Sequence, residues 1–157
     1  MTIISMKRVK TNNTSYAKIV VVDSDALIAL FNKDDTNIKQ AESFLEKLYD
    51  EKARLIYPAT TLVETVDTLQ RKLKKHTEAV QIVKFIGNAQ FATESIEAVS
   101  GIYLKEAVKF FEQRTSHRNT LADSIVAAIA KKHNADAIFS FDGWYKKLGF
   151  KLVADLY

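Results

Sequence analysis

The sequence contains no cysteine and one proline, and its longest apolar run is far shorter than the roughly 20 residues of a membrane-spanning helix. The missing cysteines exclude disulfide bonds, thiolate zinc sites and cysteine nucleophiles, so any bound metal would be held by oxygen or imidazole ligands. Met1–Lys10 also lacks the apolar stretch and small-residue cleavage site of a signal peptide. We therefore expect a soluble cytoplasmic protein without a membrane partner.

Acidic residues are missing from residues 1–18, and this segment accounts for the whole net charge of +4. Residues 19–157 sum to zero, so the body of the protein is not globally basic. Residues 1–17 also show no apolar period, which predicts a flexible basic N-terminal arm. The remaining residues, 18–157, show no linker or repeat, and their length suits one domain.

Short apolar runs alternate with amphipathic stretches along the chain. The β-branched run Ile19–Val22 is typical of a strand that is buried on both faces. Alternation of this kind predicts an α/β fold with a mainly parallel sheet of four to five strands, covered on both faces by helices. The predicted strands are 19–22, 54–57, 91–95, 137–141 and 150–153, and the main helices are 24–31, 37–51, 61–76, 77–86, 96–114 and 121–133.

Four acids occupy equivalent places in this pattern. Asp23 closes the first strand and Asp142 follows the fourth, while Glu64 and Asp123 fall in the first turns of predicted helices. Strand ends and the starts of the following helices lie along one edge of a parallel sheet. We therefore expect the four carboxylates to lie close together.

Clustered carboxylates repel one another, and a cation compensates that repulsion. Oxygen ligands suit Mg²⁺ or Mn²⁺. A site of this kind can polarise a phosphodiester bond and orient a water as nucleophile, which is the chemistry of metal-dependent nucleases. A second interpretation of each acid stays open: Glu64 and Asp123 each follow a threonine at capping-box spacing, and Ser24 or Asp25 could simply cap the first helix.

The stretches that carry these acids can be compared with a known family. They read V-V-V-D-S-D-A-L-I, T-L-V-E-T-V, T-L-A-D-S-I-V-A-A-I-A and A-I-F-S-F-D. In order and spacing the set resembles the PIN domain, particularly the single-domain VapC-type toxin ribonucleases, across roughly residues 18–153. The resemblance implies a three-layer α/β/α sandwich that cleaves RNA with Mg²⁺ or Mn²⁺. It also implies a homodimer and, for a toxin, a VapB-type antitoxin as inhibitor.

The resemblance also assigns roles to individual residues. It implies metal-binding, catalytic acids at Asp23, Glu64, Asp123 and Asp142, with the hydroxyl groups of Ser24 and Ser140 supporting the site.

A basic loop precedes the third acid and contains Arg114, His117 and Arg118. Beside an acidic metal site, such side chains could position the RNA backbone. An ordinary polar loop is an equal alternative.

Two other functions compete with the nuclease. In a phosphatase of the haloacid dehalogenase type, Asp23 would be the covalent nucleophile and Asp25 the general acid, although Ala26 departs from that pattern. A PIN-like module could instead bind RNA or a protein without cleaving it, but loss of one or two acids would mark such a module, and all four are present.

Overall fold

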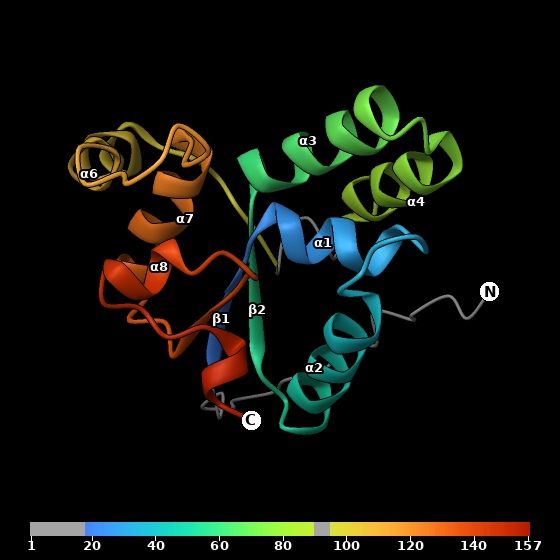
Figure 1. The fold of residues 1–157 in the computed structure, drawn as a ribbon, viewed down its shortest axis with the longest axis horizontal. Helices are drawn as coiled ribbons and strands as arrows, with labels where there is room; N and C mark the ends of the chain where they lie inside the picture. Colours follow the sequence, from blue (N-terminus) through green and yellow to red (C-terminus); the bar gives the residue numbers. More distant parts are fainter. Residues whose placement is uncertain (1–17, 90–94) are drawn as a thin grey trace.

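The computed structural model describes residues 18–89 and 95–157, and its central layer is a parallel β-sheet (Figure 1). The strands are β1 (Ile19–Val22), β2 (Arg54–Pro58), β3 (Ile96–Glu97) and β4 (Ala137–Phe139), in the spatial order β3-β2-β1-β4. Each neighbouring pair is parallel. The predicted mainly parallel sheet is confirmed, with four strands.

The central strand β1 contributes to a hydrophobic core on each face of the sheet. Val20, Val21 and Val22 are almost completely buried. Successive side chains of a strand point to opposite faces, so Val20 and Val22 pack in one core while Val21 packs in the other.

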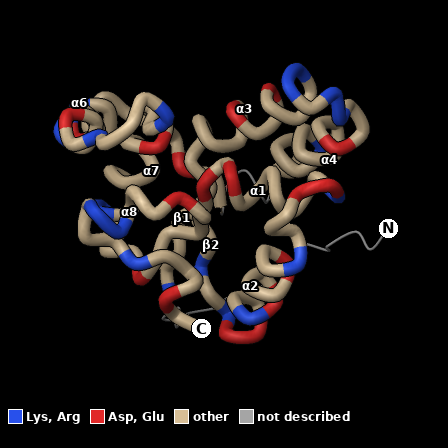
Figure 2. The backbone as a smooth tube through the Cα atoms, viewed as in Figure 1, with Lys and Arg blue, Asp and Glu red and all other residues tan. Residues whose placement is uncertain are grey.

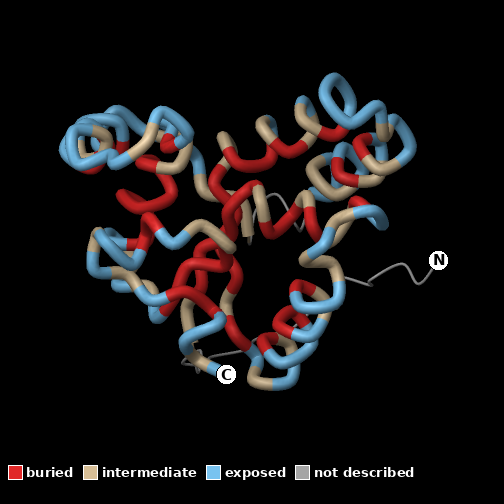
Figure 3. The backbone as a smooth tube through the Cα atoms, in the orientation of Figure 1, coloured by how far each residue is buried: buried red, intermediate tan, exposed pale blue. Residues whose placement is uncertain are grey.

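Helices cover both cores. One core is covered by α1 (Ser24–Phe31), α2 (Ile38–Asp50), α3 (Ala59–Asp67) and α4 (His76–Ile86), and the other by α6 (Gly101–Phe111), α7 (Leu121–Lys132) and α8 (Trp144–Lys147). Figure 3 shows the buried backbone concentrated at the centre, between these two layers. The predicted three-layer α/β/α sandwich is confirmed.

The sequence of α7 explains its central position. Seven consecutive residues, Ser124–Ala130, are buried, and several of them are alanine. Small side chains let the helix lie close to the sheet, while Ile125, Val126 and Ile129 fill the space between. The start of α7 is thereby fixed beside the carboxyl ends of the strands.

The start of α3 differs from its prediction. The helix begins at Ala59, directly after Pro58, and no side chain caps it, so the capping box expected from Thr61 and Glu64 is wrong. The fixed φ angle of proline already suits a helix start. Glu64 therefore lies in the second turn, and α3 continues into a π-helical stretch, η1 (Thr68–Lys72).

From the sequence, Val80, Val83, Phe85 and Ile86 are expected to form the apolar face of α4, and this expectation is wrong in part. Val80 and Val83 are each 51% exposed, whereas Ala79 and Ile82 are buried. These two residues are three positions apart on one face and belong to the same core as Leu69 of η1, so the valines turn outward.

Of two further predictions around β3, one is not tested and the other is wrong. The strand expected at 91–95 lies almost entirely outside the described residues. The helix expected from residue 96 begins only at Gly101, because Ile96 and Glu97 pair with Tyr57 and Pro58 as β3.

The fifth strand, expected at 150–153, does not form. Leu152 makes one isolated parallel bridge to Ile138, and Val153–Asp155 then forms a 3₁₀ turn, η2, in which the Asp155 carboxylate accepts from the Leu152 N–H. In the described ranges, no helix is long and apolar enough to cross a membrane.

Candidate functional site

The carboxyl ends of β1 and β4 lie side by side and carry the first acids of the site. Val22 is paired with Phe139, and the Asp23 N–H donates to the Phe139 carbonyl over 3.0 Å. The sequence predicted Asp23 as the last residue of the first strand. In the structure β1 ends at Val22, and Asp23 is the N-cap of α1. Ser140 and Asp142 follow Phe139 directly in the loop after β4.

Asp23 is buried, and both of its oxygens have donors. Oδ1 accepts from the Ser24 N–H at 2.7 Å, and Oδ2 accepts from the Tyr145 hydroxyl at 2.9 Å. Burial raises the pKa of Asp23 well above its usual value, and the negative charges of Asp25 and Asp123 raise it further. Two donors therefore hold a carboxyl group whose ionised form is disfavoured by its surroundings.

Asp25 ties α1 to the loop after β4. Its Oδ2 accepts from the Ser140 hydroxyl at 2.9 Å and from the Phe141 N–H at 2.8 Å. Burial is the main cause that raises the pKa of Asp25. The side chain that caps α1 is that of Asp23, so the alternative that Ser24 or Asp25 caps this helix is wrong.

The hydroxyl group of Ser140 connects Asp25 and Asp142. While its hydroxyl donates to Asp25, its oxygen accepts from the Asp142 N–H at 3.0 Å. The Asp142 carboxylate is itself held by the Trp144 N–H at 2.8 Å and by the buried side-chain amide of Asn119 at 3.2 Å. The loop after β4 is thus held by Asp25, by the Trp144 N–H and by the Asn119 amide.

Asp123 lies at the centre of the electrostatic interactions among the acids. The predicted capping box is present: its Oδ2 accepts from the Thr120 N–H at 2.7 Å, and its own N–H donates to the Thr120 hydroxyl at 3.2 Å. The pKa of Asp123 is raised to about 6, mainly by burial and then by the charges of Glu64 and Asp142, against the lowering effect of the Thr120 hydrogen bonds. Asp123 therefore both caps its helix and interacts with all three other predicted acids.

The four predicted acids interact through their charges, and none forms an ion pair with a described lysine, arginine or histidine. Figure 2 shows acidic segments meeting where α1 and α7 begin. Within residues 18–89 and 95–157, however, no three acidic or histidine side chains are grouped closely enough to hold a metal ion. Three of the carboxylates, those of Asp23, Asp123 and Asp142, each accept a hydrogen bond from a different backbone N–H group.

The basic loop lies outside these contacts. Arg114 is exposed, with its guanidinium 4.4 Å from the centre of the Phe111 ring, and it donates to the Phe111 carbonyl at 3.1 Å. His117 and Arg118 are exposed as well. A role for the three in binding RNA stays a prediction.

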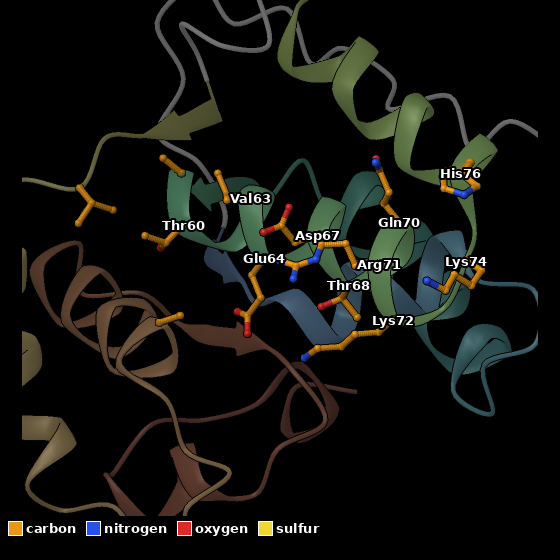
Figure 4. A pocket seen from close by; sticks show the side chains of 13 residues that line it. Thr60, Val63, Glu64, Asp67, Thr68, Gln70, Arg71, Lys72, Lys74 and His76 are labelled. Atoms are coloured by element: carbon orange, nitrogen blue, oxygen red, sulfur yellow. The ribbon is translucent and has the colours of Figure 1, made fainter.

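A groove of about 1180 Å³ opens beside Glu64 (Figure 4). We call it the η1 groove. It is lined by Ala59, Thr60, Val63, Glu64, Asp67, Thr68, Gln70, Arg71, Lys72, Lys74, His76, Val99 and Ala122. It runs from the first turn of α7, next to Asp123, along α3 to the basic residues at and after η1.

Tyr145, Asn119 and Asp25 hold the acids in place, and sequence reasoning gave none of them that role. Tyr145 and Asp23 are 122 residues apart, and Asn119 and Asp142 are 23 apart. Only Asp25 could have been recognised from the sequence as part of the site, because it directly follows Asp23 and Ser24.

Known proteins resemble this chain over most of its length. A family model described as the PIN domain matches residues 20–151. A VapC ribonuclease of Aquifex aeolicus is 25% identical over 134 residues, which cover 85% of this chain and 94% of that protein.

Solved structures share the fold. VapC20 of Mycobacterium tuberculosis, described as a toxin that cleaves the sarcin-ricin loop, superimposes with a TM-score of 0.67 at 20% identity, over 83% of this chain and 95% of that chain. VapBC2 of Rickettsia felis, bound to a DNA fragment from its promoter, superimposes with a TM-score of 0.58 at 16% identity, over 85% of this chain and 96% of that chain. FitAcB of Neisseria gonorrhoeae superimposes with a TM-score of 0.62 at 14% identity, over 85% of this chain and 95% of that chain.

Proposed function

Because the chain belongs to the PIN domain family, we propose that it is an endoribonuclease that hydrolyses RNA phosphodiester bonds with the help of Mg²⁺ or Mn²⁺. The observation that carries the proposal is the set of mutually interacting carboxylates at the carboxyl edge of the sheet, with Asp123 at its centre. The likeness to a VapC ribonuclease supports the choice of RNA.

The residues present fit a hard divalent cation. Asp23, Glu64, Asp123 and Asp142 offer only oxygen ligands. Burial raises the pKa values of Asp23 and Asp123, neighbouring carboxylates raise them further, and none of the four acids forms an ion pair with a described cation. When bound, the ion would polarise the phosphodiester and lower the pKa of a water nucleophile. In the proposal these four acids hold the ion, and the hydroxyl groups of Ser24 and Ser140 support the site.

The chain's own contacts position the acids for this chemistry. Tyr145 fixes one oxygen of Asp23, and Ser140 holds the loop that carries Asp142. Arg114, His117 and Arg118 follow α6 on the loop before Asp123, and we propose that they draw the RNA backbone toward an edge that would otherwise repel it.

The test is cleavage of a mixed set of labelled RNAs by purified protein with Mg²⁺, Mn²⁺ or EDTA. We expect cleavage only with metal, and Asp23→Asn should lower kcat/KM by at least about 100-fold, the upper end of the effect of removing a metal's outer partners. Asp50→Asn, an exposed acid at the end of α2, is the matched control. Cleavage in EDTA, or full activity in Asp23→Asn, would refute the proposal.

We also propose that the protein is a toxin with a VapB-type antitoxin, acts in the cytoplasm and forms a homodimer. The likeness in fold to VapBC2 and FitAcB supports the partner. Growth arrest on expression, relieved by a co-expressed neighbouring gene, would test the toxin role, and light scattering would test the dimer. The phosphatase alternative is not favoured, because the family match spans residues 20–151 and includes the later acids that a phosphatase would leave without roles.

A further inference from the structure

The η1 groove contains three cations without an acidic partner. Arg71, Lys72 and Lys74 are exposed, and none of them forms an ion pair in the part of the chain that the structure describes. Their neighbour Lys75 is different, because it pairs with Asp34 and does not line the groove. The three free charges are therefore available to an anionic ligand.

The backbone gathers these cations at one end of the groove. Leu69 is completely buried and anchors η1 to the core. The π-helical turn then presents Arg71 and Lys72, and the chain reverses at Lys74, whose φ of 58° lies in the left-handed region. Figure 4 shows Arg71 and Lys72 extending back along the helix toward Glu64 and Asp67. The cations thus reach toward the acidic edge.

The rest of the groove suits a strand of nucleic acid. Arg71 lies seven positions after Glu64, about two helical turns farther along the groove. Ala59, Val63, Val99 and Ala122 give the groove an apolar side, and flat base faces can lie against such a surface.

We propose that the η1 groove binds the RNA strand beside the scissile phosphate, with Arg71, Lys72 and Lys74 contacting phosphates. The inference rests on the proposed ribonuclease function, because a strand that is cut at the acids must continue along the surface beside them. Glu64, one of those acids, lines the groove, so the groove is continuous with the site. Arg114, His117 and Arg118 do not line it.

The experiment measures binding of a labelled, random-sequence 20-nucleotide RNA in EDTA, where cleavage does not interfere. The variant Arg71→Ala/Lys72→Ala/Lys74→Ala is compared with Lys132→Ala/Lys147→Ala/Lys151→Ala, which removes three exposed cations elsewhere and has the same net charge. Thermal melting checks that both triple variants fold.

We expect the groove variant to bind RNA about 10- to 30-fold more weakly than the parent. Each lost surface charge should weaken binding about two- to threefold, and the three effects multiply. The plot of log affinity against log salt concentration has a negative slope, and its steepness should decrease by about 2 in the groove variant. This follows from about 0.7 for each of the three lost phosphate contacts with a single strand. The control variant should keep most of the parent's affinity and slope.

An equal loss of RNA affinity in the two variants would overturn the proposal, since binding would then depend on net charge alone. Unchanged RNA binding in the groove variant would also overturn it and would leave the groove to another occupant, such as an acidic peptide. Because binding is measured without metal, a protein that fails to cleave RNA can still pass or fail this test. The proposed nuclease function and the groove are thereby judged separately.

Discussion

The raised pKa of Asp123 predicts that Asp123→Asn makes the metal-free protein more stable at neutral pH. The folded-state pKa is about 6, against an ordinary value of 3.8. Between these values the folded protein holds a proton that the unfolded chain has released, and above pH 6 the folded protein carries a charge that its surroundings disfavour. The loss of folding stability caused by the Asp123 charge is therefore absent below about pH 4 and complete above about pH 6.

A difference of about two pKa units corresponds to roughly 3 kcal/mol as an upper limit. Asp123 is only partly buried, so solvent screening reduces the expected gain to about 1 kcal/mol. Asparagine keeps an oxygen that can accept from the Thr120 N–H, so the capping box is preserved in part.

The assay is urea denaturation of both proteins in EDTA from pH 4 to pH 8. The stability of Asp123→Asn relative to the parent should rise by about 1 kcal/mol over this range, which is about 2–4 °C in Tm. Adding Mg²⁺ or Mn²⁺ should stabilise the parent more than the variant. Asp50→Asn controls for the loss of one negative charge. A stability difference that does not change with pH would refute the reasoning.

Three other substitutions test the contacts around the site and the core. Tyr145→Phe leaves one oxygen of buried Asp23 without its donor and should cost about 1–3 kcal/mol in urea denaturation at pH 7; no loss would mean that the hydrogen bond is not formed. Ser140→Ala removes two hydrogen bonds to neighbouring aspartates and should cost about 2 kcal/mol and lower RNA cleavage, whereas Ser140→Thr should restore much of both. Leu48→Ala, at a fully buried core position, should cost about 2–5 kcal/mol, against less than about 0.5 kcal/mol for Val63→Ala at an exposed one.

The sequence predicted elements well where one signal was strong and local. The β-branched run Ile19–Val22 forms β1, and the capping box at Thr120 starts α7. The prediction failed where a longer-range contact decided the outcome. Ile96 and Glu97 look like the start of a helix, but their pairing with the end of β2 makes them a strand.

The candidate site was predictable to the extent that topology places it. Asp23 and Asp142 follow adjacent strands, so the parallel sheet alone brings them to one edge. Glu64 was expected there for the wrong reason, because it does not cap its helix. The partners of the acids were not predictable, since Tyr145 reads as an ordinary packing residue until the fold brings it to Asp23.

The pairing of β1 with β4 also sets when this edge can form during synthesis. Val20 is paired with Ala137, so 117 positions of chain separate the two partners. At about 5–20 residues per second, the ribosome needs roughly 6–23 s to make that stretch. A growing chain that stops before Ala137 lacks Ser140, Asp142 and Tyr145, and Asp23 then has neither β4 beside it nor its hydroxyl donor. Any translation product that ends before Tyr145 therefore carries an incomplete site.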